Sequence, residues 1–459
     1  MNAHAGAAPG EPLPWRRGLA WLAFLGPFFF LTYGLATWAA TQRANVPSVA
    51  FAWESGIPFW GWTILPYWSL DLLYGLSLLV CRTRSELDTH AKRLLTAQVV
   101  AVACFVLMPL RFSFGHPPAE GLWAVMFAAL AEFDRPFNQL PSLHIALAVI
   151  LWALYARRLS GVARRAMEGW FLLICGSVLT TYQHHFIDIP TGALLGALCL
   201  WAWPFADEGD GRAITAHWRW TDDPLRHRVA GMYVALALLP GAVALYAGGP
   251  ALWLLWVSVS LLLVAFAYAA IGVGAFQKGT NGQLSIAARW LFAPYRAGAW
   301  LNSRAWTWRD PAPVAVADGV FLGRVPTTRE LSASPFAGVV DLTAEFAVRG
   351  GVRALEVVPV LDLTRPNADA LARAARAIDR LRERGPVLVC CALGYSRSAC
   401  AVAAWLIASG RARDVDTALT MVRAARTLVV LDAGHVAALV GLTALQSDSL
   451  APGGARGAD

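Results

Sequence analysis

A cysteine and an arginine stand six positions apart in the string VCCALGYSRS at 389–398. The apolar residues before Cys391 are typical of a buried strand, and a helix is expected to begin near Arg397. A loop in this setting points backbone N–H groups, the positive helix end and a guanidinium at one spot, which is how proteins bind phosphate. The same field lowers the pKa of Cys391 and makes its thiolate a nucleophile. Gly394 lets the loop turn tightly, and Arg397 can hold two phosphoryl oxygens at once.

Thiolate attack on a phosphate ester also needs an acid that protonates the leaving oxygen. Asp362 lies 29 residues before Cys391, in the string PVLDLT at 359–364, just after a predicted strand. This is a suitable position for an acid on a mobile loop beside the phosphate site. We therefore predict a phosphatase centre formed by Cys391, Arg397 and Asp362.

A second group of ionisable residues lies in a strongly apolar part of the chain. His144 ends the string PSLH at 141–144, and His184 and Asp188 fall in the string YQHHFID at 182–188. On a helix, residues four apart share a face, so the Asp188 carboxylate can orient and charge-stabilise the His184 imidazole. Ionisable side chains in membrane segments are costly and usually functional. These residues predict a second site, at one face of a membrane.

The elements that must position these residues follow from the composition. Of 459 residues, 57% are hydrophobic and only 15% are charged, against about 25% charged in ordinary soluble proteins. This excludes a disordered chain and a disulfide-stapled secreted module, and it indicates a polytopic membrane protein. We expect an all-α membrane domain at 1–275 with about eight transmembrane helices, at 17–41, 57–81, 94–114, 143–157, 167–185, 190–205, 229–248 and 250–275. The segment 190–205 is short, so seven helices or a re-entrant piece remain alternatives.

Positive charge sets the orientation of these segments. Arg16 and Arg17 precede the first, and the loops after the second, fourth and sixth are rich in basic residues, whereas the turn at 247–250 is uncharged. By the positive-inside rule we expect both termini in the cytoplasm of a bacterial plasma membrane, with the histidine site on the opposite side. The net charge of +8 then reflects topology and not nucleic-acid binding. We expect the long first segment to be retained and not cleaved as a signal peptide.

The chain changes character after residue 275. Residues 276–313 mix Trp with Arg and Lys, which suits either a plain linker or a helix at the inner membrane interface. From 314 to 446 the pattern is that of a soluble α/β domain. Its strands are expected at 320–322, 338–342, 354–360 and 386–390, and its helices at 367–384, 396–409, 414–426 and 432–446. The small polar residues of 447–459 predict a disordered tail.

Residues 314–446 resemble the dual-specificity, cysteine-dependent phosphatases. The strings DGVFLG at 318–323 and VDLT at 340–343, then Asp362, the cysteine loop and a helix with Arg423 and Arg426, follow in that family's order. The resemblance implies a phosphocysteine intermediate on Cys391 and Asp362 as general acid. The residues expected to bind phosphate or ease departure of the thiolate are Gly394, Ser396, Arg397 and Ser398.

One position departs from this family. Its members usually have histidine immediately before the nucleophile, where this chain has Cys390. The departure implies a slower enzyme, or a catalytically inactive relative that still binds phosphate. Alternatively, Cys390 or Cys400 could trap Cys391 as a reversible disulfide.

The apolar half resembles the PAP2 superfamily of membrane lipid phosphatases over 90–205, closest to the branch of the inositolphosphorylceramide synthases, in which PSLH replaces the more usual PSGH. The resemblance implies that His184 is the nucleophile, Asp188 its partner and His144 the general acid. Ser142 would bind phosphate. Two basic residues of the family pattern are missing, because Ala128 and Val178 stand at their positions. Positive charge could come instead from Arg111 and Arg135.

The sequence thus predicts an integral membrane phosphatase with two covalent phosphoenzyme sites. Its substrates would be a lipid phosphate at the His184 site and a phosphoprotein or phospholipid on the cytoplasmic side. A lipid phosphotransferase with a regulatory phosphatase domain is one alternative, and a phosphate-sensing scaffold with degenerate sites is another. Neither mechanism needs a metal or another cofactor, and no Cys/His spacing suggests zinc.

Overall fold

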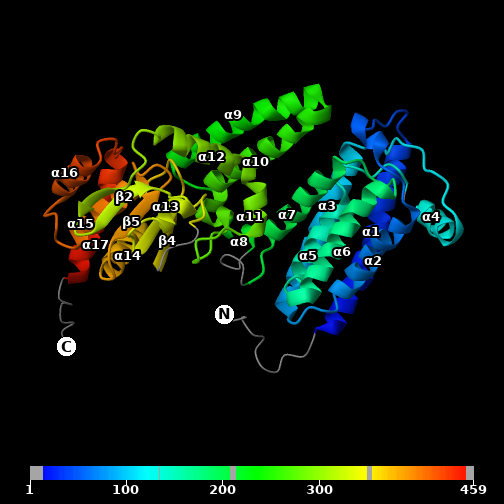
Figure 1. The fold of residues 1–459 in the computed structure, drawn as a ribbon, viewed down its shortest axis with the longest axis horizontal. Coiled ribbons are helices and arrows are strands. Elements are labelled where there is room, and N and C mark those ends of the chain that lie inside the picture. Colours follow the sequence, from blue (N-terminus) through cyan, green and yellow to red (C-terminus); the bar gives the residue numbers. More distant parts are fainter. Residues whose placement is uncertain (1–13, 134, 207–212, 349–353, 451–459) are drawn as a thin grey trace, which may run out of the picture. The chain divides into compact units, whose positions relative to one another are not determined.

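The computed structural model describes residues 14–133, 135–206, 213–348 and 354–450 (Figure 1). The chain forms two compact units, one of Met1–Ala216 with Pro240–Trp256 and the other of His217–Leu239 with Val257–Asp459. The unit boundaries between residues 239 and 240 and between residues 256 and 257 both fall inside helices. The last two apolar helices, which precede the expected domain boundary at residue 275, thus contribute residues to the second unit.

The first unit is helical. Its helices are α1 (Trp15–Thr41), α2 (Ile64–Ser77), α3 (Arg84–Leu107), α4 (Gly121–Phe133), α5 (Leu143–Tyr155), α6 (Gly161–Thr180), α7 (Asp188–Ala202) and α8 (Ile214–His217), with short 3-10 turns η1 (Ala52–Gly56) and η2 (Gly61–Thr63). Gly192 and Gly196 bring α7 against α5: a Cβ at Gly192 would lie 2.5 Å from the Ser142 carbonyl oxygen, and one at Gly196 2.7 Å from Val149 Cβ. This close approach places the start of α5 beside the start of α7.

Among the described residues, four helical stretches are long and apolar enough to cross a membrane: α1, α3, α9 (Pro224–Ala247) and the continuous run Gly249–Phe276. That run joins η3 (Gly249–Trp253), α10 (Leu254–Phe266), a π-helical turn η4 (Ala267–Ile271) and η5 (Gly272–Phe276). The expected eight transmembrane helices are not confirmed. At about 1.5 Å per residue, the 13 residues of α5 reach about 20 Å, less than the roughly 30 Å of a bilayer core. The helix α4 was not expected.

The second unit contains a five-stranded mixed sheet in the order β1-β2-β5-β3-β4. Its strands are β1 (Val314–Ala317), β2 (Val320–Arg324), β3 (Gly338–Thr343), β4 (Ala354–Val360) and β5 (Val387–Cys391). Only β1 is antiparallel to its neighbour. The four predicted strands are present. The hairpin strand β1 was missed because it is four residues long and only partly buried.

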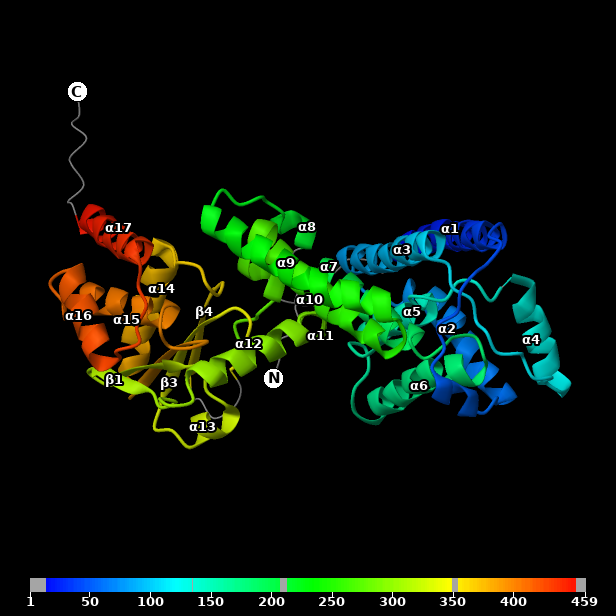
Figure 2. The same ribbon diagram turned by 90° about the horizontal axis from the view of Figure 1, so that it is seen from above.

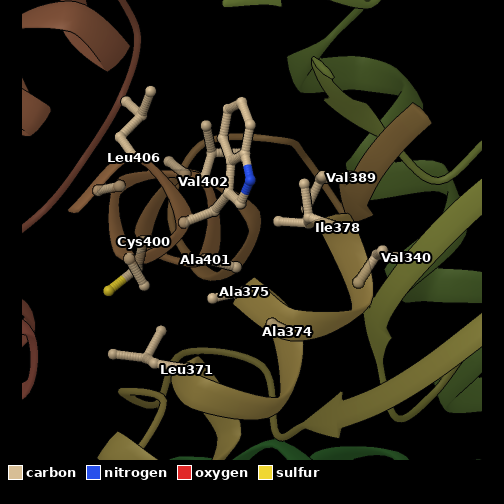
Figure 3. Packing of buried hydrophobic residues seen from close by; sticks show 14 of the residues in the cluster. Val340, Leu371, Ala374, Ala375, Ile378, Val389, Cys400, Ala401, Val402 and Leu406 are labelled. Atoms are coloured by element: carbon tan, nitrogen blue, oxygen red, sulfur yellow. The ribbon is translucent and has the colours of Figure 1, made fainter. Parts of the chain in front are cut away.

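Four helices cover one face of the sheet: α14 (Ala368–Arg382), α15 (Arg397–Ala408), α16 (Val415–Ala425) and α17 (Ala433–Leu450). Figure 3 shows α14 and α15 packing together, with Ala375 and Ala401 between them and Val340 and Val389 of the strands beneath. The small alanines let the helices approach closely. The disorder expected from residue 447 is wrong for 447–450, since α17 continues to Leu450. Residues 451–459 lie outside the described residues.

The opposite face of the sheet is covered by α13 (Thr328–Ser332) and by α12 (Ala293–Trp306), which follows α11 (Ile286–Leu291). Figure 2 shows α13 on the side of the sheet away from α14 to α17. Trp300 of α12 packs edge to face on Phe346, with ring centroids 5.6 Å apart. The stretch 276–313, expected to be a linker or an interfacial helix, contains α11 and α12, and α12 packs the partly buried Trp300 against the sheet.

Candidate active site

The phosphate loop runs from β5 to α15 and curls around the Cys391 sulfur. The Gly394 N–H and the Ser398 hydroxyl each donate a hydrogen bond of 3.2 Å to Cys391 Sγ. Gly394 has φ of +78°, and a Cβ there would lie 2.5 Å from the backbone carbon of Gly323. Only glycine fits this close contact with β2. The position of the strand therefore determines where the loop lies relative to the sheet.

The environment of Cys391 favours its thiolate. Burial alone would raise the pKa of this thiol, since its side chain is almost fully covered. The positive charge of Arg397, the Ser398 hydroxyl and the backbone N–H groups of Ser398 and Gly394 outweigh burial and lower the pKa below the usual cysteine range. The sulfur is thus prepared for nucleophilic attack.

Arg397 is held by two carboxylates. Its Nη2 lies 2.9 Å from Glu345 Oε1 and 2.8 Å from Asp362 Oδ1, and its Nη1 donates to the Val360 carbonyl oxygen at 2.8 Å. Arg397 and Glu345 are buried, whereas Asp362 is 27% exposed. Glu345 was not predicted from the sequence. The only signal was an acid just after the strand string VDLT, on the edge of the sheet where parallel strands end.

Asp362 has the properties of a general acid. Burial raises the pKa of its carboxyl; the positive charge of Arg397 acts against this and the negative charge of Glu345 adds to it, so that the pKa lies above the usual aspartate value. A raised pKa keeps more of the carboxyl protonated near neutral pH. The predicted acid therefore lies at the site, with Cys391 in the same cavity.

Residues of the stretch 276–313 support the loop from behind. The Ser303 hydroxyl donates to the carbonyl oxygen of Ala392, the residue after the nucleophile, at 2.6 Å. Arg304 Nη2 donates at 2.8 Å to the carbonyl oxygen of Val325, whose own N–H donates at 2.7 Å to the carbonyl oxygen of Cys391. The phosphate loop is thus tied to α12, a contact that sequence reasoning missed.

A buried lysine from the same stretch lies beneath the residue that replaces the usual histidine. Lys278 Nζ donates to Asp341 Oδ2 at 2.5 Å and to the Thr343 carbonyl oxygen at 2.6 Å. Asp341 pairs with Cys390 in the register of β3 and β5. Burial and the negative charge of Asp341 raise the pKa of Cys390 well above the usual cysteine value. Cys390 is therefore a neutral thiol in the core. All seven cysteines are free.

A cavity of about 470 Å³ opens above Cys391. On one side, Ser396 Oγ lies 2.9 Å from His435 Nε2, and His435 Nδ1 lies 2.8 Å from Asp432 Oδ1. Arg365 pairs with Asp432 at 2.8 Å. Sequence reasoning placed Ser396 at the phosphate loop but missed Arg365, from one other segment, and Asp432 and His435, from a second. The side chains that line the cavity are Leu225, Val229, Asp362, Leu363, Thr364, Arg365, Cys391, Leu393, Tyr395, Ser396, Arg397, Val430, Asp432 and His435.

In the helical unit, the histidine group predicted from the sequence does come together. His184 Nδ1 lies 3.0 Å from Asp188 Oδ2, and His184 Nε2 lies 3.1 Å from the hydroxyl of Ser142, which caps α5. His144 and His184 line one cavity, and the His144 ring stacks on Tyr67 with centroids 4.1 Å apart. The expected helical face is wrong in one respect: His184 precedes α7, which begins at Asp188.

This second cavity is small and carries no basic side chain. Its volume is about 60 Å³, and none of the described residues that line it is Lys or Arg. Arg111 and Arg135, expected to supply positive charge, are exposed. Val178, at the position of a missing family arginine, is fully buried. Asp134, next to Arg135, lies outside the described residues.

A neighbouring pair, formed by His185 and Glu54, was not predicted from the sequence. His185 Nδ1 lies 2.9 Å from Glu54 Oε2, and the N–H of Ser113 donates to His185 Nε2 at 3.1 Å. Because Nε2 accepts that hydrogen bond, Nδ1 carries the proton and donates to Glu54. The pair therefore joins three loops of the helical unit. Among the residues that the structure describes, no group of three His, Cys, Asp or Glu side chains could hold a metal ion.

A cysteine whose thiol pKa is lowered, on a strand-to-helix loop with a buried arginine and an aspartate of raised pKa beside it, is the arrangement typical of cysteine-dependent phosphatases. Residues 320–443 match the family described as dual specificity phosphatase, catalytic domain. The chain therefore contains a C-terminal dual-specificity phosphatase domain and is by class a phosphoric monoester hydrolase. No curated protein matches the chain.

The domain is similar to solved phosphatase structures. Tk-PTP in its active form is 29% identical, and the match covers 97% of that chain and 29% of this one, with a TM-score of 0.27. Human DUSP28 is 27% identical, and the match covers 96% of that chain and 30% of this one, with a TM-score of 0.26. A mouse putative dual specificity phosphatase complexed with zinc tungstate is 28% identical. The match covers 91% of that chain and 30% of this one, with a TM-score of 0.27. None of these three matches extends over more than 30% of this chain.

Proposed function

We propose that the protein is an integral membrane phosphatase whose Cys391 is the nucleophile of a cytoplasmic phosphomonoesterase. The observation that carries the proposal is the cradle around Cys391 Sγ, with hydrogen bonds from Gly394 and Ser398 and with Arg397 held beside Asp362. Four helices long and apolar enough to span a bilayer support the membrane assignment. With both termini in the cytoplasm, this site faces the cytoplasm.

The reaction follows from these groups. The Cys391 thiolate attacks phosphorus and forms an S–P bond as the P–O bond to the leaving group breaks. Asp362 transfers its proton to the leaving oxygen, while Arg397 and the loop N–H groups hold the phosphoryl oxygens. Water then attacks the phosphocysteine, its proton returns to Asp362, and inorganic phosphate leaves. The Ser398 hydroxyl stabilises the departing thiolate by its hydrogen bond.

Hydrolysis of para-nitrophenyl phosphate by the purified protein tests this proposal. Cys391→Ser should abolish turnover, and Asp362→Asn should lower it by about 10²-fold or more. Cys390→Ala, which removes the neighbouring thiol, is the matched control and should keep the wild-type rate. Equal activity in wild type, Cys391→Ser and Asp362→Asn contradicts the cysteine mechanism and leaves the phosphate-sensing scaffold as the explanation.

A second candidate function is a PAP2-like lipid phosphatase at His184, on the opposite side of the membrane. The observation that favours it is the chain of contacts from Ser142 through His184 to Asp188. If Nδ1 donates to Asp188, Nε2 is unprotonated and its lone pair accepts a hydrogen bond from the Ser142 hydroxyl. A bound phosphate would take that hydroxyl as its own ligand and leave the Nε2 lone pair for attack on phosphorus, and His144, in the same cavity, would protonate the leaving oxygen. The cavity must widen to admit a lipid headgroup.

Labelled phospholipid tests the second site. His184→Ala should abolish the lipid turnover that survives in a Cys391→Ser protein, and His116→Ala, a histidine outside the cavity, is the control. Release of free phosphate identifies a phosphatase, whereas transfer of the label to an alcohol identifies a lipid phosphotransferase with a regulatory cysteine domain. Lipid turnover that persists in the Cys391→Ser, His184→Ala protein rules out His184 as nucleophile.

A further inference from the structure

The cavity above Cys391 is much larger than a phosphate group. Its volume of about 470 Å³ falls within the roughly 300–1,000 Å³ that usually encloses a whole small ligand. Cys391 and Arg397 occupy its phosphate-binding end, so the rest of the cavity must hold the group to which the phosphate is attached. The walls of that remaining space indicate what the group is.

Part of the wall comes from a candidate membrane span. Leu225 and Val229, one turn apart at the start of α9, line the cavity. The helix begins at Pro224, so at about 1.5 Å per residue both side chains lie within roughly 8 Å of its first residue. A substrate bound at Cys391 therefore lies against the end of a helix that is long and apolar enough to cross a bilayer.

Residues before α9 mark the level of the membrane surface. Trp218 and Trp220 are 53% and 61% exposed, and Arg219 lies between them. Exposed tryptophan beside arginine is typical of the boundary between headgroups and water. The start of α9, and the cavity that it walls, then lie at the level of the lipid headgroups.

The other candidate span of this unit reaches the same side of the site. The Tyr268 hydroxyl donates to the carbonyl oxygen of Asp362 at 2.7 Å, and Arg226 Nε of α9 donates to the Tyr268 carbonyl oxygen at 2.9 Å. The general acid is thus fixed to one span and, through Arg226, to the other. The leaving group must contact Asp362 to receive its proton. It therefore leaves the site on the side where Tyr268 and Arg226 bring the two candidate spans close to Asp362.

Two of the side chains that line the cavity are apolar and exposed. Leu363, directly after the acid, is 55% exposed, and Val430 on the opposite segment is 66% exposed, although both line the cavity. Such side chains do not stabilise a phosphate dianion, and exposing them to water is unfavourable. They suit the glycerol and the first methylenes of a lipid whose headgroup enters the cavity.

From this arrangement we propose that the Cys391 site hydrolyses a phosphomonoester carried on the headgroup of a membrane phospholipid, taken from the leaflet in which α9 begins. The proposal rests on the proposed phosphatase function of Cys391. The S–P bond forms as the P–O bond to the headgroup breaks, Asp362 protonates the headgroup oxygen, and water then releases inorganic phosphate. The product is the same lipid with a free hydroxyl group, which remains in the membrane.

The test uses the full-length His184→Ala protein, in which the other candidate lipid site cannot contribute, reconstituted in phosphatidylcholine vesicles. The value of kcat/KM is compared for phosphatidylinositol 4-phosphate and phosphatidic acid in the vesicles, for soluble inositol phosphate and glycerol 3-phosphate, and for phosphotyrosine and phosphoserine peptides. We expect at least one vesicle lipid to exceed every soluble substrate by about 100-fold. The same protein with Cys391→Ser should turn over none of them.

The outcomes separate the two proposals. A phosphopeptide hydrolysed as well as the best lipid, or a soluble headgroup phosphate hydrolysed as well as its lipid, overturns the lipid assignment while Cys391 chemistry stands. Turnover of para-nitrophenyl phosphate that survives Cys391→Ser overturns the proposed function instead.

Substitution of Leu225, an α9 residue that lines the cavity, provides a second test. Leu225→Gln should raise KM for the vesicle lipid by about tenfold, because it places a polar group against the lipid, and Leu225→Ile should restore it. Leu301→Gln is the matched control, since Leu301 lies on α12, is 69% exposed and does not line the cavity. An unchanged KM for the lipid in Leu225→Gln, with a wild-type unfolding temperature, overturns the proposal.

Discussion

The Tyr268 hydroxyl, near the end of the Gly249–Phe276 run, donates a hydrogen bond of 2.7 Å to the backbone carbonyl oxygen of Asp362. The Asp362 side chain is fixed separately, since its Oδ1 lies 2.8 Å from Arg397 Nη2. Leu363, the next residue, has φ of +55°, which is unfavourable for leucine. Asp362 is therefore held through both its backbone and its side chain, next to a strained residue, and the backbone contact comes from a candidate membrane span.

Tyr268→Phe should loosen this segment without touching the nucleophile. One hydrogen bond contributes about 1 kcal/mol net, so we expect kcat to fall about fivefold for alkyl phosphates, whose poor leaving groups need the acid. The fall should be smaller for para-nitrophenyl phosphate, and KM should change little. The measurement is the dependence of kcat on the pKa of the leaving group.

Tyr246→Phe is the matched control, because Tyr246 lies on α9 and is 96% exposed. Equal loss of kcat for good and poor leaving groups in Tyr268→Phe would show that the hydroxyl does not position Asp362.

Most of the phosphatase sheet could be predicted because its strands are apolar runs of five to seven residues bounded by turn residues. The phosphate loop could be predicted as well, since strand, cysteine, glycine and arginine are contiguous in the sequence. Glu345 and Lys278 could not: each reaches its partner only because the strands bring distant segments to one edge, and a buried acid or lysine has the same local sequence signal as an exposed one.

The stretch 276–313 allowed more than one interpretation from its sequence. Tryptophan mixed with arginine suits a membrane interface, and the sequence alone does not distinguish that surface from the face of a sheet. Trp300 packs on Phe346, whereas Trp290 and Trp306 are exposed. The eight expected membrane spans are not confirmed for a related reason: α5 and α7 are apolar but short, and burial inside a helical bundle and burial in lipid select the same residues.

The pH dependence of kcat/KM should be bell-shaped. The lowered pKa of Cys391 means that the thiolate is lost only when the pH falls below that lowered value, which sets the acidic limb. The raised pKa of Asp362 means that the proton needed by the leaving group is lost as the pH rises through that raised value, which sets the basic limb. Asp362→Asn should remove the basic limb and leave the acidic limb in place.

Ser398→Ala should move the acidic limb to higher pH. The variant removes a hydrogen bond to Cys391 Sγ that stabilises the thiolate, so more alkaline solution is needed to deprotonate the sulfur. Ser409→Ala, at the other end of α15, is the control, because its hydroxyl donates to the carbonyl oxygens of Trp405 and Leu406 in its own helix. An acidic limb that stays in place in Ser398→Ala, as iodoacetamide alkylation rates would report independently, contradicts this role.

Lys278→Met should destabilise the phosphatase unit strongly. It leaves the fully buried Asp341 without its positive partner, and breaking one side of a buried ion pair costs about 3–5 kcal/mol. We expect the unfolding temperature in detergent to fall by about 10 °C. Adding Asp341→Leu should recover much of that loss, whereas Lys92→Met, at an exposed lysine, should have little effect. A double variant no more stable than Lys278→Met would show that the two charges do not compensate each other.

Gly394→Ala separates the shape of the phosphate loop from its chemistry. Every charged group remains, but the new Cβ would lie 2.5 Å from the Gly323 backbone and would stand on a residue with φ of +78°. The loop must therefore move away from β2, and a displacement of about 1 Å can cost 10²-fold in rate. We expect kcat/KM for para-nitrophenyl phosphate to fall by about that factor. Gly410→Ala has nearly the same strain, with φ of +72°, but open space around its Cβ; it should lower stability by about 1 kcal/mol and leave the rate unchanged. Wild-type kcat/KM in Gly394→Ala would mean that close contact with β2 does not set the position of Cys391.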